Sequence, residues 1–226
     1  MTTHKELFRR YPGNPVLTAA QWPDVVNSVF NAGVAEYGGE TILLVRVEER
    51  TGLSRLTVAR SADGYTDWVV ENDRGMSAEP GNFAEQWGIE DPRITKCGDD
   101  YMIAYTGFSA GGPLICLAST KDFVTFERRG VLTPPEDKDA ALFPCRIDGR
   151  WVLLHRPVPN FAHMGAHIWL SYSPDLRHWG DMTLLLAAER GGLWDAGKIG
   201  LGPPPLATDE MPRPDSSRTR LKTSGG

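Results

Sequence analysis

Short stretches in which apolar and polar side chains alternate recur along this 226-residue chain. Residues 56–59 and 168–171 follow a period of two, which is the pattern of a β-strand with one buried face. Glycine, aspartate and proline bound these stretches, and the chain holds 24 glycines and 17 prolines, which favour turns. A single helical turn is indicated only at residues 83–87. The pattern therefore predicts an all-β fold built from many short strands.

An internal repeat organises these strands. In three segments an alternating strand is followed by serine, a nearby aspartate, a small turn and an aromatic residue. The repeated aspartates are Asp63, Asp122 and Asp175, at intervals of 59 and 53 residues. Another strand, turn and strand precede them, at residues 35–47, 95–107 and 145–157. About four short strands per repeat, arranged around an axis, predict a β-propeller, and a stacked β-sandwich is the alternative.

Charge and composition exclude several classes of partner. With 24 Lys and Arg against 29 Asp and Glu, the net charge is −5. No basic cluster suits a phosphate backbone or an anionic membrane, so we expect a small ligand and neither nucleic acid nor membrane as a partner. The three cysteines form no CxxC motif and are expected to be free thiols. Because no apolar run could span a bilayer and the first residues lack an apolar signal segment, the sequence predicts a cytoplasmic protein.

Several segments, taken in order, are similar to those of glycoside hydrolase family 130, the β-mannoside phosphorylases and their hydrolase relatives. The matching segments are NPVL (14–17), VFNAG (29–33), LLVRVEERTGLSRLTVARSADG (43–64), GIEDPRITKCGDDYMIAYT (88–106), LASTKDF (117–123), KDAALFPCRIDGRWVLLHRP (138–157), SYSPDLRHWG (171–180) and WDAGKIGLGPPPLATDE (194–210). The resemblance extends over about residues 12–210 and implies a five-bladed β-propeller. It implies inorganic phosphate as a co-substrate and no other cofactor. No metal is expected either, because His163 and His167 have no carboxylate at a ligand spacing.

The repeat pattern stops near the C-terminus. Residues 211–226 contain two apolar residues in sixteen and are rich in Ser, Thr, Arg and Pro, so we expect a disordered tail that departs from the family. Five blades of this repeat length need about 280 residues. We therefore expect residues 1–210 to form an incomplete propeller, truncated by its last blade or more. Its unpaired strand edges would favour a homo-oligomer.

Asp91 is the candidate catalytic residue. Pro92 follows it and biases its backbone toward an extended conformation at the start of a strand, from which a carboxylate can point into a central cavity. From the residues alone, a turn aspartate that caps its own backbone is the more ordinary explanation. The resemblance implies that Asp91 is the general acid, which protonates the departing glycosidic oxygen through a hydroxyl of the mannose.

Three basic residues are candidates for holding phosphate. Glycosidases ordinarily use two carboxylates, whereas a phosphorolytic enzyme, whose nucleophile is already an anion, needs one carboxylate and a group of cations. Lys138, Arg156 and Lys198 lie on different hairpins, so only a closed circular fold would bring them together. Taken singly, each is more typical of a surface charge. The resemblance implies that all three are phosphate ligands.

Asn31 and Arg46 are the candidates for the sugar-binding subsite. Arg46 lies in the middle of an apolar strand, where a charge is unfavourable unless it is paired or faces a wet cavity. A salt bridge to Glu48 or Asp91 would satisfy Arg46 equally well. The resemblance implies that both side chains face the sugar at the cleaved bond.

Together with the resemblance, these residues predict a glycoside phosphorylase. The expected reaction is inverting phosphorolysis of β-1,4-mannosides, which releases α-mannose 1-phosphate, and the expected partners are a β-mannoside oligosaccharide and phosphate. Retention of all three basic candidates favours phosphate use over the alternative of a β-mannoside hydrolase. A catalytically inactive, truncated propeller that binds carbohydrate is the second alternative.

Overall fold

The computed structural model describes residues 9–158, 165–189 and 194–208. The described strands are β1 (Val26–Tyr37), β2 (Glu40–Glu49), β3 (Ser54–Ser61), β4 (Val69–Met76), β5 (Ile89–Cys97), β6 (Asp100–Ser109), β7 (Gly112–Thr120), β8 (Glu127–Val131), β9 (Asp137–Leu142), β10 (Trp151–Pro157), β11 (Ile168–Ser173) and β12 (Gly180–Leu186). The one helix in these ranges is the short 3₁₀ helix η1 (Ala19–Gln21). Among the described residues, no helix has the length and apolarity needed to cross a membrane. His163 and the tail predicted at 211–226 lie outside the described residues.

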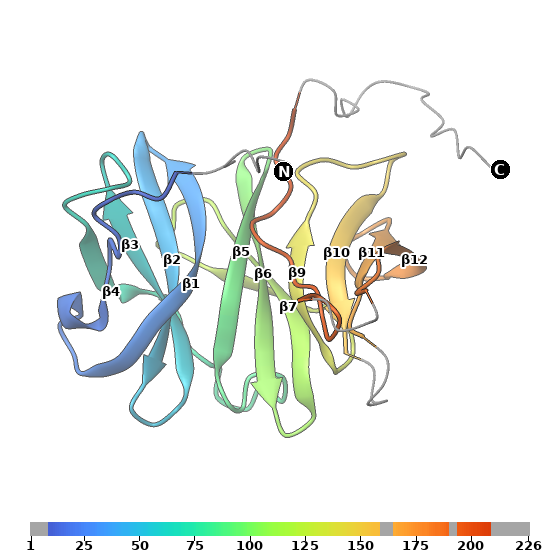
Figure 1. Ribbon diagram of the computed structural model, residues 1–226, viewed down its shortest axis with the longest axis horizontal. Coiled ribbons are helices and arrows are strands. Elements are labelled where there is room, and N and C mark those ends of the chain that lie inside the picture. The colour runs from blue at the N-terminus through green and yellow to red at the C-terminus, as the bar shows by residue number, and fades with distance from the viewer. Residues whose placement is uncertain (1–8, 159–164, 190–193, 209–226) are drawn as a thin grey trace, which may run out of the picture.

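The strands form three separate four-stranded antiparallel sheets, each from four consecutive strands. Figure 1 shows the sheets side by side in sequence order. We call them blade 1 (β1 to β4), blade 2 (β5 to β8) and blade 3 (β9 to β12). Strand β5 contacts both β1 and β9, so the first strands of the three blades adjoin one another. Successive sheets with adjoining first strands are blades of a propeller, which confirms the predicted all-β propeller fold over a two-sheet sandwich.

The repeated hydroxyl and aspartate build the same turn in each blade, between its third and fourth strands. The aspartate carboxylate accepts two backbone N–H groups, at 2.8 to 2.9 Å, from the second and third residues after it. The hydroxyl two positions before it accepts the N–H of the residue after the aspartate, at 2.8 to 3.0 Å. The three pairs are Ser61 with Asp63, Thr120 with Asp122, and Ser173 with Asp175. The predicted repeat is thus confirmed, with threonine in place of serine in blade 2.

Apolar side chains fill the spaces between neighbouring blades. One buried cluster joins blades 1 and 2 and includes Leu44, Ile89 and Phe123. A second joins blades 2 and 3 and includes Leu117 and Leu153. Since close-packed interiors of this kind resist deformation, the first strands of the blades are held at fixed positions relative to one another.

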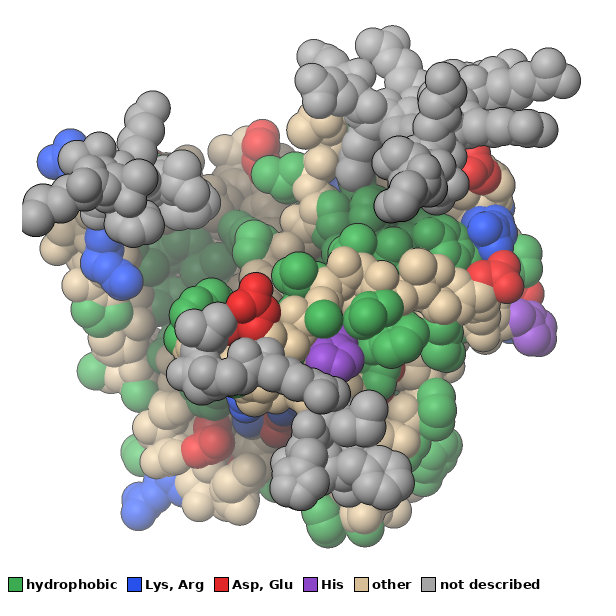
Figure 2. Space-filling model, turned by 45° about the vertical axis from the view of Figure 1, so that its right-hand side comes forward, with side chains coloured by type: hydrophobic (Ala, Val, Ile, Leu, Met, Phe, Trp, Pro, Cys, Tyr) green, Lys and Arg blue, Asp and Glu red, His purple; other side chains and the backbone are tan. Residues whose placement is uncertain are grey.

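The outer strand of blade 3 carries exposed apolar side chains. Met182, Leu184, Leu185 and Leu186 of β12 are between 46% and 56% exposed. Figure 2 shows hydrophobic side chains on this side of the molecule. Within the described residues β12 pairs only with β11, so its other edge offers unpaired backbone groups next to this apolar surface.

Candidate active site

Three residues with left-handed backbones occupy equivalent places on the first strands of the three blades. Asn31 of β1, Asp91 of β5 and Asp139 of β9 have φ angles of 46°, 49° and 55°. Each lies where the pairing with the second strand is irregular, and such a bulge re-aims a side chain away from the regular alternation. Asn and Asp adopt this conformation more readily than most residues. All three line one cavity of about 310 Å³.

Blades 1 and 2 approach each other closely beside this cavity. A Cβ atom at Gly33 would lie 2.8 Å from the carbonyl oxygen of Pro92. Only glycine therefore lets β1 come this close to β5, which gives the glycine of the VFNAG segment a physical reason.

The structure brings Asp91 together with both predicted sugar-binding residues. Its Oδ1 accepts a hydrogen bond from Arg46 Nη1 at 2.9 Å and another from Asn31 Nδ2 at 3.0 Å. The Asp91 side chain is 11% exposed. Within the described residues its carboxylate bonds to side chains of blade 1 and not to its own turn, so the self-capping explanation is wrong.

Arg46 donates hydrogen bonds to three neighbouring side chains. Besides Asp91, it donates from Nε to Ser54 Oγ at 3.0 Å and from Nη2 to Glu90 Oε1 at 2.9 Å. Its guanidinium carbon lies 4.5 Å from the centre of the Phe30 ring. The salt bridge to Asp91 that the sequence left open is present. Among the described residues, Arg46 forms salt bridges to Glu90 and Asp91 and none to Glu48.

Glu90 is a member of the site that the sequence analysis missed. Burial raises the pKa of its carboxyl, an effect that the charges of Arg46 and Lys138 oppose. The signal available in the sequence was its position next to Asp91, in the GIEDPRIT segment. Lys138, a predicted phosphate residue, is thus one of the positive charges that favour the ionised form of Glu90.

Arg156 is buried rather than a surface charge, at 5% exposure. Its Nε and Nη2 donate to Asp139 Oδ2 at 2.9 and 2.8 Å. Lys138 is its direct partner in the pairing of β9 with β10. Two of the three predicted phosphate residues thus lie side by side on blade 3, beside the cavity that Asp91 lines.

Lys198 lies on an exposed segment that follows blade 3. It forms an isolated parallel bridge with Ala166, and its side chain makes no ion pair with another described residue. Two residues later, a Cβ atom at Gly200 would lie 2.9 Å from Asp139 Oδ2. The segment that carries Lys198 therefore packs against the carboxylate that holds Arg156.

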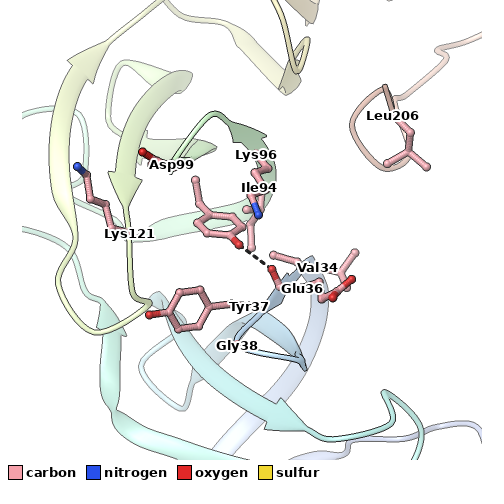
Figure 3. A pocket seen from close by; sticks show the side chains of 11 residues that line it. Val34, Glu36, Tyr37, Gly38, Ile94, Lys96, Asp99, Lys121 and Leu206 are labelled. Atoms are coloured by element: carbon pink, nitrogen blue, oxygen red, sulfur yellow. Dashed lines mark hydrogen bonds between the residues drawn. The ribbon is translucent and has the colours of Figure 1, made fainter. Parts of the chain in front are cut away.

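A second cavity, of about 540 Å³, contains none of the predicted site residues. It lies between the C-terminal ends of β1 and β5, where Tyr37, Lys96 and Lys121 line it (Figure 3). In the wall of this cavity, Tyr101 donates a hydrogen bond to the carbonyl oxygen of Glu36 at 2.7 Å. The candidate active site is the smaller cavity because Asn31 and Asp91 meet there.

Comparisons with known proteins identify the family of this chain. The sequence model of a family described as β-1,4-mannooligosaccharide phosphorylase matches residues 5–211. The chain is 32% identical to a β-1,2-mannobiose phosphorylase of Listeria innocua, over 89% of this chain and 72% of that protein. It is 30% identical to a β-1,4-mannooligosaccharide phosphorylase of Ruminococcus albus, over 91% of this chain and 62% of that protein.

The fold matches as well. The solved structure of the Listeria innocua enzyme in complex with β-1,2-mannobiose has a TM-score of 0.78 and 30% identity, and covers 89% of this chain and 72% of that chain. A glycosyl hydrolase from Bacteroides ovatus, 21% identical over 87% of this chain and 65% of that one, has a TM-score of 0.72 and shares the fold. The sequence match and the shared fold show that the chain belongs to glycoside hydrolase family 130, the mannoside phosphorylase family of five-bladed β-propellers.

Proposed function

We propose that this chain catalyses inverting phosphorolysis of a β-mannoside, with Asp91 as the general acid. The observation that carries the proposal is the placement of the Asp91 carboxylate in the 310 Å³ cavity, held by Arg46 and Asn31. On the adjoining blade, Arg156 is bound to Asp139, which lines the same cavity, and Lys138 is the strand partner of Arg156. A proton donor and a group of cations are the two elements that phosphorolysis requires.

In the proposed reaction a phosphate oxygen attacks the anomeric carbon of the mannosyl unit as the glycosidic bond breaks on the opposite face. The electron pair of that bond stays on the departing oxygen. Asp91 supplies the proton for this oxygen through a hydroxyl of the mannose. The products are α-mannose 1-phosphate and the shortened acceptor. Lys138, Arg156 and Lys198 hold the phosphate and offset its charge.

Arg46 and Asn31 contribute to the proton transfer as well as to sugar binding. As Asp91 gives up its proton, a negative charge forms on a carboxylate that already accepts hydrogen bonds from both side chains. Donors that are in place before the charge develops stabilise the transition state without reorganisation. We therefore assign Arg46 the role of stabilising ionised Asp91.

Phosphorolysis is favoured over hydrolysis because the chain retains all three basic candidates for holding phosphate. An inverting hydrolase needs a second carboxylate to remove a proton from water. Here Glu90 is paired with Arg46, and Asp139 is paired with Arg156. Phosphate, already an anion, needs no such base.

The linkage of the substrate has two candidates. The family description and the Ruminococcus albus relative name β-1,4-mannooligosaccharides, which is the linkage predicted from the sequence. The relatives from Listeria innocua and Thermoanaerobacter, at 32% and 34% identity, are named as β-1,2-mannobiose phosphorylases, which favours a β-1,2-mannoside as the second candidate.

The deciding experiment incubates the chain with β-1,4-mannobiose or β-1,2-mannobiose, with and without inorganic phosphate. We expect phosphate-dependent release of mannose 1-phosphate, with the α-anomer identified by NMR. Release of free mannose at the same rate without phosphate would indicate a hydrolase. Binding of a mannobiose without turnover would indicate an inactive carbohydrate-binding propeller.

A further inference from the structure

Arg93 connects the strand of Asp91 with blade 3 and with the segment that follows blade 3. It lies two residues after Asp91 in β5, with a side chain that is 16% exposed. Its Nε donates to the carbonyl oxygen of Gly202 at 3.0 Å, and its Nη2 donates to that of Leu201 at 2.8 Å. Its Nη1 lies 3.4 Å from the carbonyl oxygen of Asp91. The Arg93 donors are thus directed at protein groups rather than at the open part of the cavity.

Arg93 also shares Asp139 with Arg156. Arg93 Nη2 lies 3.6 Å from Asp139 Oδ1, while Arg156 donates twice to Oδ2. The guanidinium groups of Arg93 and Arg156 therefore share the single carboxylate of Asp139. Asp139 offsets only one of their two positive charges. Without Arg93, the charge of Asp139 would be offset by Arg156 alone, which would leave Arg156 less attractive to an anion.

The same side chain fixes the segment that carries Lys198. Leu201 and Gly202, whose carbonyl groups Arg93 binds, follow Lys198 by three and four residues. At the other end, Ala166 holds this segment through backbone hydrogen bonds of 3.2 Å with Gly197 and Ile199. Lys198 lies between the two residues that Ala166 holds, a few residues before the carbonyl groups that Arg93 binds.

We propose that Arg93 is a positioning residue for the phosphate subsite. It sets Arg156, through Asp139, and Lys198, through the 201–202 backbone, in place relative to the strand of Asp91. This proposal rests on the proposed function, because it assumes that these cations hold phosphate. Its direct consequence concerns the affinity for phosphate rather than for the sugar.

The test measures binding of inorganic phosphate by calorimetry to the unaltered chain and to Arg93→Gln, Arg93→Lys and Asp139→Asn. We expect Arg93→Gln to weaken phosphate binding at least tenfold. Arg93→Lys should be intermediate, since one ammonium cannot reproduce the planar fork of donors. In assays with mannobiose, KM for phosphate should rise while KM for mannobiose changes less than threefold.

Arg60 provides the matched control. Its side chain is 13% exposed and pairs with Glu71 at 2.9 Å, on blade 1 and outside the candidate site. Arg60→Gln should lower the unfolding midpoint by about as much as Arg93→Gln does, and it should leave the phosphate affinity unchanged. If Arg93→Gln does not fold, the phosphate affinities of Asp139→Asn and Arg93→Lys decide whether Arg93 positions the phosphate subsite.

The outcomes separate this proposal from the proposed function. Phosphate affinity in Arg93→Gln equal to that of Arg60→Gln overturns the role of Arg93. Absence of phosphate binding by the unaltered chain overturns both the phosphate subsite and the role of Arg93. Phosphate binding without release of mannose 1-phosphate overturns the proposed function alone, and the binding data then still judge Arg93.

Discussion

Arg46 donates a hydrogen bond from Nη1 to Oδ1 of Asp91 at 2.9 Å, across the boundary between blades 1 and 2. The general acid of the proposed mechanism and the side chain that stabilises its ionised form therefore come from different repeats. Such a pair exists only when the two blades are packed together. In the proposed mechanism, catalysis and the packing of neighbouring blades are consequently linked at this hydrogen bond.

Replacing Asp91 by asparagine should remove the proposed proton donor while keeping the shape of the side chain. We expect the rate of mannose 1-phosphate formation from a mannobiose to fall by about 10²- to 10⁴-fold, the range typical of a general acid. With 4-nitrophenyl β-mannoside the fall should be much smaller, because nitrophenolate leaves without protonation. Equal losses on both substrates would contradict the role of Asp91 as a general acid.

Replacing Arg46 by glutamine should destabilise the fold as well as weaken sugar binding. The change leaves Glu90 and Asp91 without their counterion in a site where Arg46 itself is only 13% exposed. We expect the free energy of unfolding to fall by about 2–4 kcal/mol in urea titrations.

The double variant Arg46→Gln, Glu90→Gln provides the control for this loss. Removing the Glu90 charge should restore part of the stability, because burial already raises the pKa of this carboxyl and disfavours its ionised form. KM for mannobiose should remain elevated in both variants. A double variant no more stable than the single one would show that the loss does not come from unpaired charge.

The repeated aspartate turns predict a specific sensitivity to acid. Backbone N–H groups that bond to the ionised Asp63 carboxylate hold its pKa well below its usual value. Because the folded pKa is lowered, this group stabilises the fold above the ordinary pKa of 3.8, and the contribution is lost as the pH falls toward the folded pKa.

Asp63→Asn should therefore flatten the decline of the unfolding midpoint between about pH 5 and pH 2. Thermal unfolding followed by circular dichroism at a series of pH values measures this slope. Asp73→Asn is the control, because the exposed Asp73 makes no hydrogen bond to another described residue. The same slope in both variants would argue against the turn as the source of acid sensitivity.

The sequence sufficed for the features that depend on neighbours along the chain. The period-two pattern located the strands, and the repeated aspartates located one turn in each blade because their chemistry is local. The meeting of Asn31 and Arg46 at the Asp91 carboxylate was expected only from the family resemblance. Nothing in the residues alone shows that positions 31 and 91 lie on adjoining strands.

The ion pairs of the site lay beyond the sequence for a physical reason. Arg93 and Asp139 are 46 positions apart on different blades, and their pairing depends on a bulge that re-aims Asp139. Glu90 was hidden in the same way, since its partner Arg46 belongs to blade 1. Charged residues within apolar strands were visible, but the identity of their partners required the packing of the blades.

A buried polar chain across blade 3 predicts a large effect from a small substitution. His155 Nδ1 lies 2.6 Å from Asp137 Oδ2, and His155 Nε2 lies 2.7 Å from Ser171 Oγ. All three side chains are buried. Ser171→Ala would leave a ring nitrogen without a partner, so we expect a loss of about 1–3 kcal/mol in urea unfolding.

Ser119→Ala is the matched control for this loss. Ser119 is also buried, on the third strand of blade 2, but its partner Arg129 is exposed and can turn to water. For Ser119→Ala we expect the free energy of unfolding to fall by less than about 1 kcal/mol.

Because Asp137 and His155 adjoin Lys138 and Arg156 in the paired strands, a shift of strand register in Ser171→Ala should also weaken phosphate binding. Equal losses of stability in the two alanine variants would argue against the buried chain as a special support of blade 3.

The exposed apolar strand β12 predicts that the chain associates with a second copy of itself. Leu184 and Leu186 are each about half exposed beside a strand edge with no partner in the described residues, and such edges pair between molecules. We expect light scattering to give at least the mass of a dimer, and Leu184→Lys with Leu186→Lys to give a monomer. Val124→Lys, at a similarly exposed apolar residue of blade 2, should leave the mass unchanged. A monomeric unaltered chain at micromolar concentration would refute self-association through β12.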